Sequence, residues 1–194
     1  MSQRINTQSP NTLRLKRNAA KQKGMTFIEV LIALVIMVTG ILGAVAMQAT
    51  AKQSSFDAMQ RSLASSLAQD ILERMRSNAS ANLNGYAGTY GANDPGAAPA
   101  PACNTSGTFC TSAQLMATDI HQWTQSLRGG DVTLAGNNVG GLTDGRGCIT
   151  EANNVVTITI TWQSKAETVD GGVVAACGTS NSKRRQVRIA GFIT

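Results

Sequence analysis

The stretch Gly24-Met25-Thr26-Phe27-Ile28-Glu29, followed by Val30-Leu31-Ile32-Ala33-Leu34, decides how this chain of 194 residues is organised. Six of the 17 Lys and Arg residues and none of the 11 Asp and Glu residues precede it. The 11 basic residues that remain after Gly24 therefore balance the 11 acidic ones. Because the excess positive charge belongs to residues 1–24 alone, it gives no reason to expect nucleic-acid binding.

A long uncharged run follows this stretch. Residues 30–51 contain no Asp, Glu, Lys or Arg, and 22 residues of helix at about 1.5 Å each would cross a hydrocarbon core of about 30 Å. The basic residues before the run favour a cytoplasmic position for residues 1–24 and transfer of Lys52 onward across the membrane. A secretory signal fits less well, because Ala44-Val45-Ala46, its small-x-small cleavage site, would lie inside the run.

Glu29 is the residue that a plain single-span anchor does not explain. A carboxylate near the start of a membrane helix is costly unless it is paired or lies near the interface. Thr26-x-x-Glu29 fits a capping box, and the helix dipole favours negative charge there. Capping does not explain why Gly24 directly follows Lys21-Gln22-Lys23, with the apolar run immediately behind.

Lys23-Gly24, Met25 and Glu29 resemble, in order and spacing, the class III signal of type IV prepilins and type II secretion pseudopilins. The resemblance implies that prepilin peptidase cuts between Gly24 and Met25 and methylates the new amine of Met25. It also implies that Glu29 neutralises the N-terminal ammonium of a neighbouring subunit, an ion pair that sets register more than net stability. Met at the first mature position and a leader of 24 residues both depart from the commonest pattern of the family.

Residues 21–78 resemble more specifically a minor pilin of the PilV type. The most distinctive part is Glu73-Arg74-Met75-Arg76-Ser77-Asn78, and residues 40–51 lack the proline of many major pilins. The resemblance implies a minor subunit that primes pilus assembly, with a position at the pilus tip as one option. The implied partners are prepilin peptidase, other minor pilins, the major pilin and the inner-membrane assembly platform.

Two other functions stay open at this point. A minor pseudopilin of a type II secretion system would share the same signal. A DNA-uptake or adhesion pilin would use the basic cluster Lys183, Arg184, Arg185 and Arg188 as a contact patch. We favour the simpler interpretation that this cluster is a solvated strand edge protected by charge. Nucleic acid is therefore not an expected partner.

The patterns predict an α+β fold, a long N-terminal helix packed on a small antiparallel sheet head, which agrees with the pilin-like fold that the resemblance implies. Apolar residues at helical spacing extend the first helix over residues 25–76: Phe56, Met59, Leu63, Leu67, Ile71, Leu72 and Met75. Asp57–Arg61 and Asp70–Arg74 are expected ion pairs on its other faces. Residues 77–101, rich in Asn, Gly, Ala and Pro, predict a long loop.

A second helix and several strands are predicted after this loop. Thr111-x-x-Gln114 predicts a helix start, Gly129-Gly130 predicts its end, and Trp123 is expected in the core. Strands are expected weakly over residues 131–134 and more strongly over 146–151, 155–163 and 186–193. Val156, Ile158, Ile160 and Trp162 alternate with polar residues, so one face of that strand should be buried against the first helix.

The four cysteines, Cys103, Cys110, Cys148 and Cys177, all follow residue 76 and favour two disulfides in an oxidising compartment. Four free thiols are the alternative. Three pairings are possible, and we favour 103–110 with 148–177, because the first pair would close a short loop that contains glycine. The expected organisation is a removable leader (1–24), a transmembrane and filament-core helix (25–51) and a periplasmic head (52–194). The expected location is the inner membrane with a single pass, and then the pilus at the cell surface.

The sequence offers little support for catalysis, a cofactor or a metal. His121 is the only histidine, which makes a metal site improbable. Gly145-x-Gly147 is followed by Thr150 where a dinucleotide fingerprint needs glycine, and Asp144-Gly145 lacks the regularly spaced acidic ligands of a calcium loop. We therefore expect a structural protein without cofactors.

Processing at Gly24 gives the first testable prediction. Co-expression with a prepilin peptidase should yield a product whose mass matches a chain that begins at N-methylated Met25. Gly24→Ala should impair processing much less than a bulky replacement of Gly24, because the cleavage site needs a small residue. A product that begins at any other residue contradicts the prediction.

Overall fold

The computed structural model describes residues 24–78, 80–103, 105–107, 109–167 and 177–194. The predicted basic leader before Gly24 lies outside the described residues. The chain forms two compact units, residues 1–45 and 46–194, and one helix, α1 (Phe27–Ser77), contributes to both. The predicted first helix is thus confirmed to within two residues at either end.

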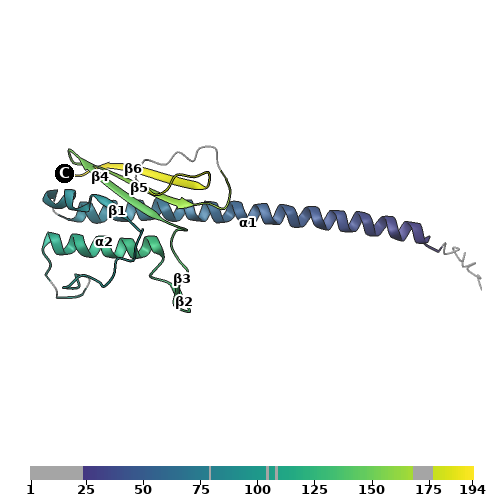
Figure 1. The fold of residues 1–194 in the computed structure, drawn as a ribbon, viewed down its shortest axis with the longest axis horizontal. Helices are drawn as coiled ribbons and strands as arrows, with labels where there is room; N and C mark the ends of the chain where they lie inside the picture. The colour runs from purple at the N-terminus through teal and green to yellow at the C-terminus, as the bar shows by residue number, and fades with distance from the viewer. Residues whose placement is uncertain (1–23, 79, 104, 108, 168–176) are drawn as a thin grey trace, which may run out of the picture. The chain divides into compact units, whose positions relative to one another are not determined.

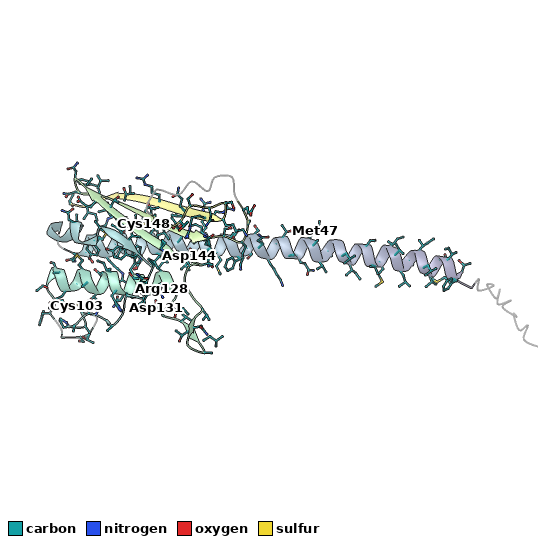
Figure 2. The ribbon with its side chains drawn as sticks, in the orientation of Figure 1. Met47, Cys103, Arg128, Asp131, Asp144 and Cys148 are labelled. Carbon is teal, nitrogen blue, oxygen red and sulfur yellow. A yellow bond between two sulfur atoms is a disulfide. The ribbon has the colours of Figure 1, made fainter. Side chains whose placement is uncertain are left out.

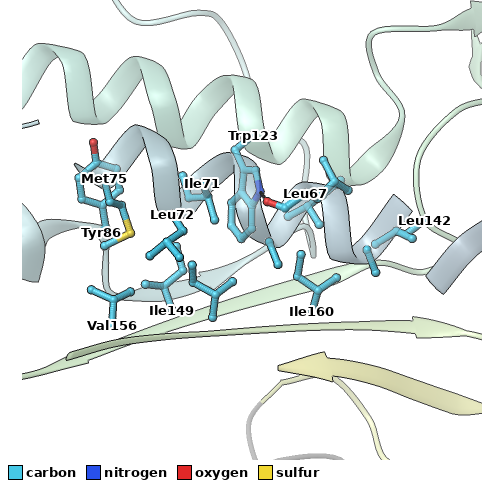
Figure 3. Close-up of a cluster of buried hydrophobic side chains, with 14 of the residues drawn as sticks. Leu67, Ile71, Leu72, Met75, Tyr86, Trp123, Leu142, Ile149, Val156 and Ile160 are labelled. Atoms are coloured by element: carbon cyan, nitrogen blue, oxygen red, sulfur yellow. Dashed lines mark hydrogen bonds between the residues drawn. The ribbon is translucent and has the colours of Figure 1, made fainter. Parts of the chain in front are cut away.

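The last part of α1 lies at the centre of the hydrophobic core of residues 46–194. Figures 1 and 3 show it between α2 (Ser112–Arg128) on one side and the sheet on the other. Its buried apolar residues are Ala64, Leu67, Ala68, Ile71, Leu72 and Met75. The predicted apolar stripe is confirmed from Leu67 onward, but Met59 remains 56% exposed because it lines an open groove beside residues 138–143.

The main sheet has the strand order β1-β4-β5-β6, and all its neighbours are antiparallel. Its long strands are β4 (Arg146–Ala152), β5 (Val155–Gln163) and β6 (Arg184–Phe192). The β4–β5 connection is a two-residue turn in which Asn153 and Asn154 both have positive φ, as a tight hairpin requires. All three predicted strands are present, and the α+β architecture is confirmed.

The central strand β5 is buried on both faces. Val156, Ile158 and Ile160 pack in the core towards α1, as predicted. Thr159 and Thr161 on the opposite face are also buried, because the chain around Cys177 covers them. The Thr161 hydroxyl donates to the Cys177 carbonyl at 2.8 Å. Alternation with threonine therefore does not mean that this second face is exposed to water.

Trp123 connects all three layers of the head. Its indole Nε1 donates to the carbonyl of Leu67 in α1 at 2.8 Å, and its ring meets Tyr90 edge-on at 5.7 Å between centroids. A Cβ on Gly147 of β4 would collide with the Trp123 ring, so the glycine allows α2 to approach the sheet. The prediction that Trp123 lies in the core is confirmed.

The segment predicted as a long loop contains two elements, and that prediction was wrong in part. A 3-10 helix, η1 (Ser80–Tyr86), is followed by β1 (Gly88–Tyr90), which pairs with β4 at the edge of the sheet. Leu83 and Tyr86 are buried in the core. Two buried side chains thus hold in place a segment that has no regular apolar pattern.

The ends of α2 follow the predicted chemistry. Thr111 and Gln114 form a reciprocal capping box, and Gly129 ends the helix in the left-handed conformation. A short hairpin of β2 (Thr133–Leu134) and β3 (Asn137–Asn138) follows. The strand prediction for residues 131–134 therefore found β2, whereas β3 was missed because Asn137 and Asn138 are not residues that favour strands.

Two disulfides close the head, Cys103–Cys110 and Cys148–Cys177, which is the pairing favoured from the sequence. The first closes a loop near the start of α2, with a sequence separation of 7. The second joins β4 to the segment before β6, with a separation of 29, and Cys177 is buried. The larger loop should lose more chain entropy when it is closed.

Removal of each disulfide should therefore have a graded effect on stability. Chain-entropy arguments predict that the double variant Cys148→Ser/Cys177→Ser loses about 1 kcal/mol more free energy of unfolding than Cys103→Ser/Cys110→Ser. Denaturant titration of the full chain in mild detergent measures both values, with the oxidised wild type as reference. Equal losses, or a larger loss for the 103–110 variant, would contradict the argument from loop length.

Candidate processing and assembly site

The predicted cleavage site lies in an exposed, non-helical lead-in to α1. Gly24, Met25 and Thr26 have no regular secondary structure, and the helix begins at Phe27. The backbone amides of Glu29 and Val30 donate to the Thr26 carbonyl at 3.1 and 3.3 Å. An exposed stretch before the first helical turn is a segment that a protease can reach.

Glu29 is exposed in the first turn of α1. Within the described part of the chain neither Thr26 nor Glu29 makes a side-chain hydrogen bond, so the capping box expected from Thr26-x-x-Glu29 is not formed. The Glu29 carboxylate has no ion pair among these residues either. It therefore remains available for a group outside this chain.

The surface that follows Glu29 is apolar on all sides. Every residue from 30 to 50 is exposed, and an 18-residue window of α1 has a mean hydropathy of 2.7. In the part of the chain that the structure describes, α1 is the one helix long and apolar enough to span a membrane. Figure 2 shows side chains such as Met47, which is 78% exposed, projecting from this part of α1, which no other described part of the chain covers. A surface of this kind needs lipid or other subunits to cover it.

The distinctive segment 73–78 at the end of α1 is a structural clamp. Arg74 pairs with Asp70 at 2.9 Å and with Asp119 of α2 at 3.3 Å, and it donates to Gln122 at 2.9 Å. The predicted Asp70–Arg74 pair is thus confirmed. Asn78 donates to the Tyr86 hydroxyl at 3.0 Å and to the Ser112 carbonyl at 2.9 Å. These contacts fix the end of α1 to η1 and α2.

Asp119 is the acceptor at the centre of this clamp. Its second carboxylate oxygen accepts a hydrogen bond from the buried Tyr86 hydroxyl at 2.8 Å. Burial, with the negative Asp119 beside it, raises the pKa of Tyr86 well above its usual range. Tyr86 therefore stays neutral at physiological pH and acts as a donor within the fold. A shifted pKa here reflects the fold, because the groups around it are satisfied by one another.

Two family models match adjoining parts of the chain. The prokaryotic N-terminal methylation motif matches residues 19–45, and the model described as type IV pilin Tt1218 matches residues 46–121. The chain belongs to the type IV pilin superfamily. No curated protein and no solved structure matches it. The first match contains Gly24, Met25 and Glu29, and the second contains the clamp residues from Arg74 to Asp119.

The predicted basic patch of this pilin needs a correction. Arg184 is only 2% exposed, because it donates to both the carbonyl and the carboxylate of Asp144, the latter at 2.5 Å. The side chains of Lys183 and Arg188 are exposed and that of Arg185 is half-buried. Arg184 therefore supports the fold, and a contact surface of four charges at residues 183–188 is not present.

Asp144 and His121 are both engaged in contacts within the pilin. The Asp144 carboxylate pairs with Arg146 at 3.0 Å as well as with Arg184, so its oxygens already have cationic partners. His121 Nε2 lies 3.0 Å from the carbonyl of Gly96. The described residues contain no group of three or more His, Cys, Asp or Glu side chains that could hold a metal ion.

Gln60 was missed at the level of sequence. It is buried in α1, where it accepts a hydrogen bond from the Thr143 amide at 2.9 Å and donates to the Gly141 carbonyl at 3.3 Å. It thereby ties α1 to the loop that leads into β4. The only hint in the sequence is that Gln60 falls between Phe56 and Ala64 on the same helical stripe, at a spacing of four.

The clamp gives the next prediction. Asp119→Ala should lower the free energy of unfolding by about 1–3 kcal/mol, because it leaves the Tyr86 hydroxyl and the Arg74 guanidinium without their shared acceptor. Glu73→Ala is the matched control, since it removes an exposed carboxylate whose one ion pair within the described residues is with Arg76 on the same helix. Its effect should stay within about 0.5 kcal/mol. Denaturant titrations compare the variants, and similar losses in both would show that the clamp adds no stability.

Proposed function

We propose that the chain is a minor pilin of a type IV pilus, processed by prepilin peptidase and acting in the priming and assembly of the filament. The observation that carries the proposal is the combination found at the start of α1. An exposed, non-helical Gly24-Met25 lead-in precedes Glu29, whose carboxylate has no partner among the described residues, and an exposed apolar helix surface follows. Each of these features suits a subunit whose first helix is buried only after assembly.

Glu29 is the proposed docking group. Its carboxylate has no partner in the described chain, and a new, methylated amine on Met25 of a neighbouring subunit would supply the opposite charge. The pair would form where water is excluded, so an unmatched partner would be strongly disfavoured and the axial register of the subunits would be set. Gly40 and Gly43 have open space where a Cβ would lie, which leaves room for a neighbouring helix to come close.

The head supplies the proposed contacts to specific subunits. Phe109, inside the Cys103–Cys110 loop, is 98% exposed. Val132, Leu134 and Val139 around the β2–β3 hairpin are each more than half exposed. Large apolar side chains at the surface suit protein contacts, and the PilV-type resemblance together with the lack of proline in residues 40–51 favours a minor subunit. Other minor pilins, the major pilin and the inner-membrane assembly platform are the proposed partners.

The proposed location follows from charge and disulfides. Residues 1–24 would remain in the cytoplasm, residues 25–51 would cross the inner membrane, and the head of residues 52–194 would fold in the periplasm before entering the pilus. Two disulfides suit an oxidising compartment. The position of this pilin at the tip belongs to the same proposal, as one role for a minor subunit that starts assembly.

A minor pseudopilin of a type II secretion system is the second candidate, because the signal around Gly24 serves both systems. The four-cysteine head and the segment 73–78 favour the pilus. A DNA-uptake or adhesion pilin is less favoured, because Arg184 is buried and the basic cluster is reduced to Lys183, Arg185 and Arg188.

A deletion strain tests the proposal. Loss of the gene should reduce the number of surface pili and leave type II secretion unchanged, and sheared pili from the wild type should contain this chain far below the level of the major subunit. A secretion defect without loss of pili would favour the pseudopilin. A level equal to that of the major subunit would contradict a minor role.

Complementation tests the role of Glu29 in the same strain. Glu29→Ala should leave processing intact and reduce incorporation into sheared pili, since the buried amine would lose its counter-charge. Glu73→Ala, which removes an exposed carboxylate from the same helix, is the matched control and should be incorporated normally. Unchanged incorporation of the Glu29 variant would contradict the docking role.

A further inference from the structure

Arg128, in the last turn of α2, lies where two hollows of the head adjoin. The larger, of about 640 Å³, runs between α1 and residues 138–143, and the smaller, of about 310 Å³, runs towards the start of β4. Because Arg128, Asn138 and Leu142 line both hollows, the two together are called the Arg128 groove. The groove lies within the unit of residues 46–194. The assembly role proposed above assigns no ligand to it.

The larger hollow offers an apolar surface. Its described walls carry Phe56, Met59 and Leu63 of α1 and Val139, which follows β3. Met59 and Val139 are each 56% exposed, so apolar side chains are open to solvent here. Of the described residues that line this hollow, Arg128 is the one that carries a charge. A ligand that fills this half must therefore bring apolar groups close to whatever it offers to the arginine.

The guanidinium of Arg128 is only partly satisfied within the chain. Its Nη1 donates to the Ala92 carbonyl at 3.4 Å, which is longer than a good hydrogen bond. Its Nε is buried without an acceptor, whereas its Nη2 has no partner among the described residues and is not buried. No carboxylate of the described chain forms an ion pair with it. The open Nη2 is therefore the atom that an anion from outside the chain can reach, while Nε stays enclosed by the fold.

The charges of the smaller hollow also favour an anion. Asp144 is the one carboxylate among the described residues that line it. This carboxylate is already paired with Arg146 at 3.0 Å and with the buried Arg184. One carboxylate between two arginines leaves an excess of positive charge, and the unpaired Arg128 adds to it. The groove as a whole therefore attracts a carboxylate and repels a lysine or an arginine.

The walls of the groove are held in place by contacts within the head. The Leu142 amide donates to the Leu127 carbonyl at 3.0 Å, which ties residues 138–143 to α2. Gln60 ties the same segment to α1 through its two hydrogen bonds. Gly140 lies so close to Gly129 that a Cβ on Gly129 would collide with the Gly140 carbonyl. A groove with fixed walls loses little conformational entropy when a partner binds.

We propose that the Arg128 groove docks a segment of another pilin subunit in which an Asp or Glu side chain lies beside apolar side chains. The carboxylate accepts from Arg128 Nη2, and the apolar side chains pack on Phe56, Met59 and Val139. Charge complementarity selects the partner, since a basic residue in the same place would be repelled. The apolar walls exclude water and thereby strengthen the charged hydrogen bond. The inference rests on the assembly role proposed above and adds to it one contact on the head.

Photocrosslinking locates the partner segment. Asn138, which borders both hollows, is replaced by p-benzoylphenylalanine in the complemented deletion strain, and sheared pili are irradiated. Mass spectrometry should find the crosslink on a different pilin subunit, in a peptide that contains Asp or Glu next to apolar residues. A crosslink to a peptide without an acidic residue, a crosslink to a second copy of this chain, or no crosslink to any pilin would overturn the proposal.

A charge swap tests the ion pair itself. Arg128→Glu should lower incorporation into sheared pili about tenfold and leave processing at Gly24 normal, because it turns an attraction into a repulsion. Exchange of the crosslinked acidic residue of the partner for Lys should do the same, and the two changes together should restore incorporation. Arg61→Glu is the matched control, since Arg61 is exposed, does not line the groove, and lacks its expected partner because Asp57 accepts from Ser164 at 2.7 Å. This control should be incorporated as the wild type is.

A milder variant guards against a loss of folding. Arg128→Gln removes the charge without reversing it and should lower incorporation by a smaller factor, and near-ultraviolet circular dichroism of the full chain in mild detergent checks that both variants are folded. Normal incorporation of Arg128→Glu, or a charge swap that does not restore incorporation, would overturn this inference alone. Piliation that is unchanged when the gene is deleted would overturn the assembly role itself, so the two failures can be told apart.

Discussion

One helix has to serve two different surroundings, and the rest of the structure depends on that constraint. From Ala64 to Met75, α1 is covered by α2 on one side and by the sheet on the other, so its apolar residues face protein in both directions. Before Thr50 the same helix has no cover from the described chain. The head can be small because α1 supplies the middle of its core, and this pilin cannot lose α1 without losing that core.

Polar contacts determine how the head is joined to this central helix. Asp119 accepts hydrogen bonds from the Tyr86 hydroxyl and the Arg74 guanidinium at one end of the core. Trp123 donates to the Leu67 carbonyl near the middle of the core. Apolar burial holds the layers together but does not specify direction, whereas each of these hydrogen bonds is satisfied in a single arrangement. The head therefore packs on α1 in one orientation, and its outer surfaces are presented consistently.

Features that depend on near neighbours could be predicted from the sequence. Apolar spacing predicted α1, and the Thr111–Gln114 box and Gly129 predicted the ends of α2. The signal around Gly24 could be recognised for the same reason, because it is defined by the order and spacing of residues within one short segment. Residues 80–90 could not be assigned, because Leu83 and Tyr86 are ordered by partners distant in sequence.

The sequence by itself determined the course of α1, the uncharged surface for lipid or filament, the placement of Glu29 at its start and the membership of the pilin superfamily. Only the tertiary structure decided which charges are free. Arg184 pairs with Asp144, which is 40 residues away in the sequence. Asp57 accepts a hydrogen bond from Ser164, which is 107 residues away, so Arg61 is left without its expected partner. An ion pair depends on distance in space, and local spacing cannot determine a contact that forms only after the sheet has packed on the helix.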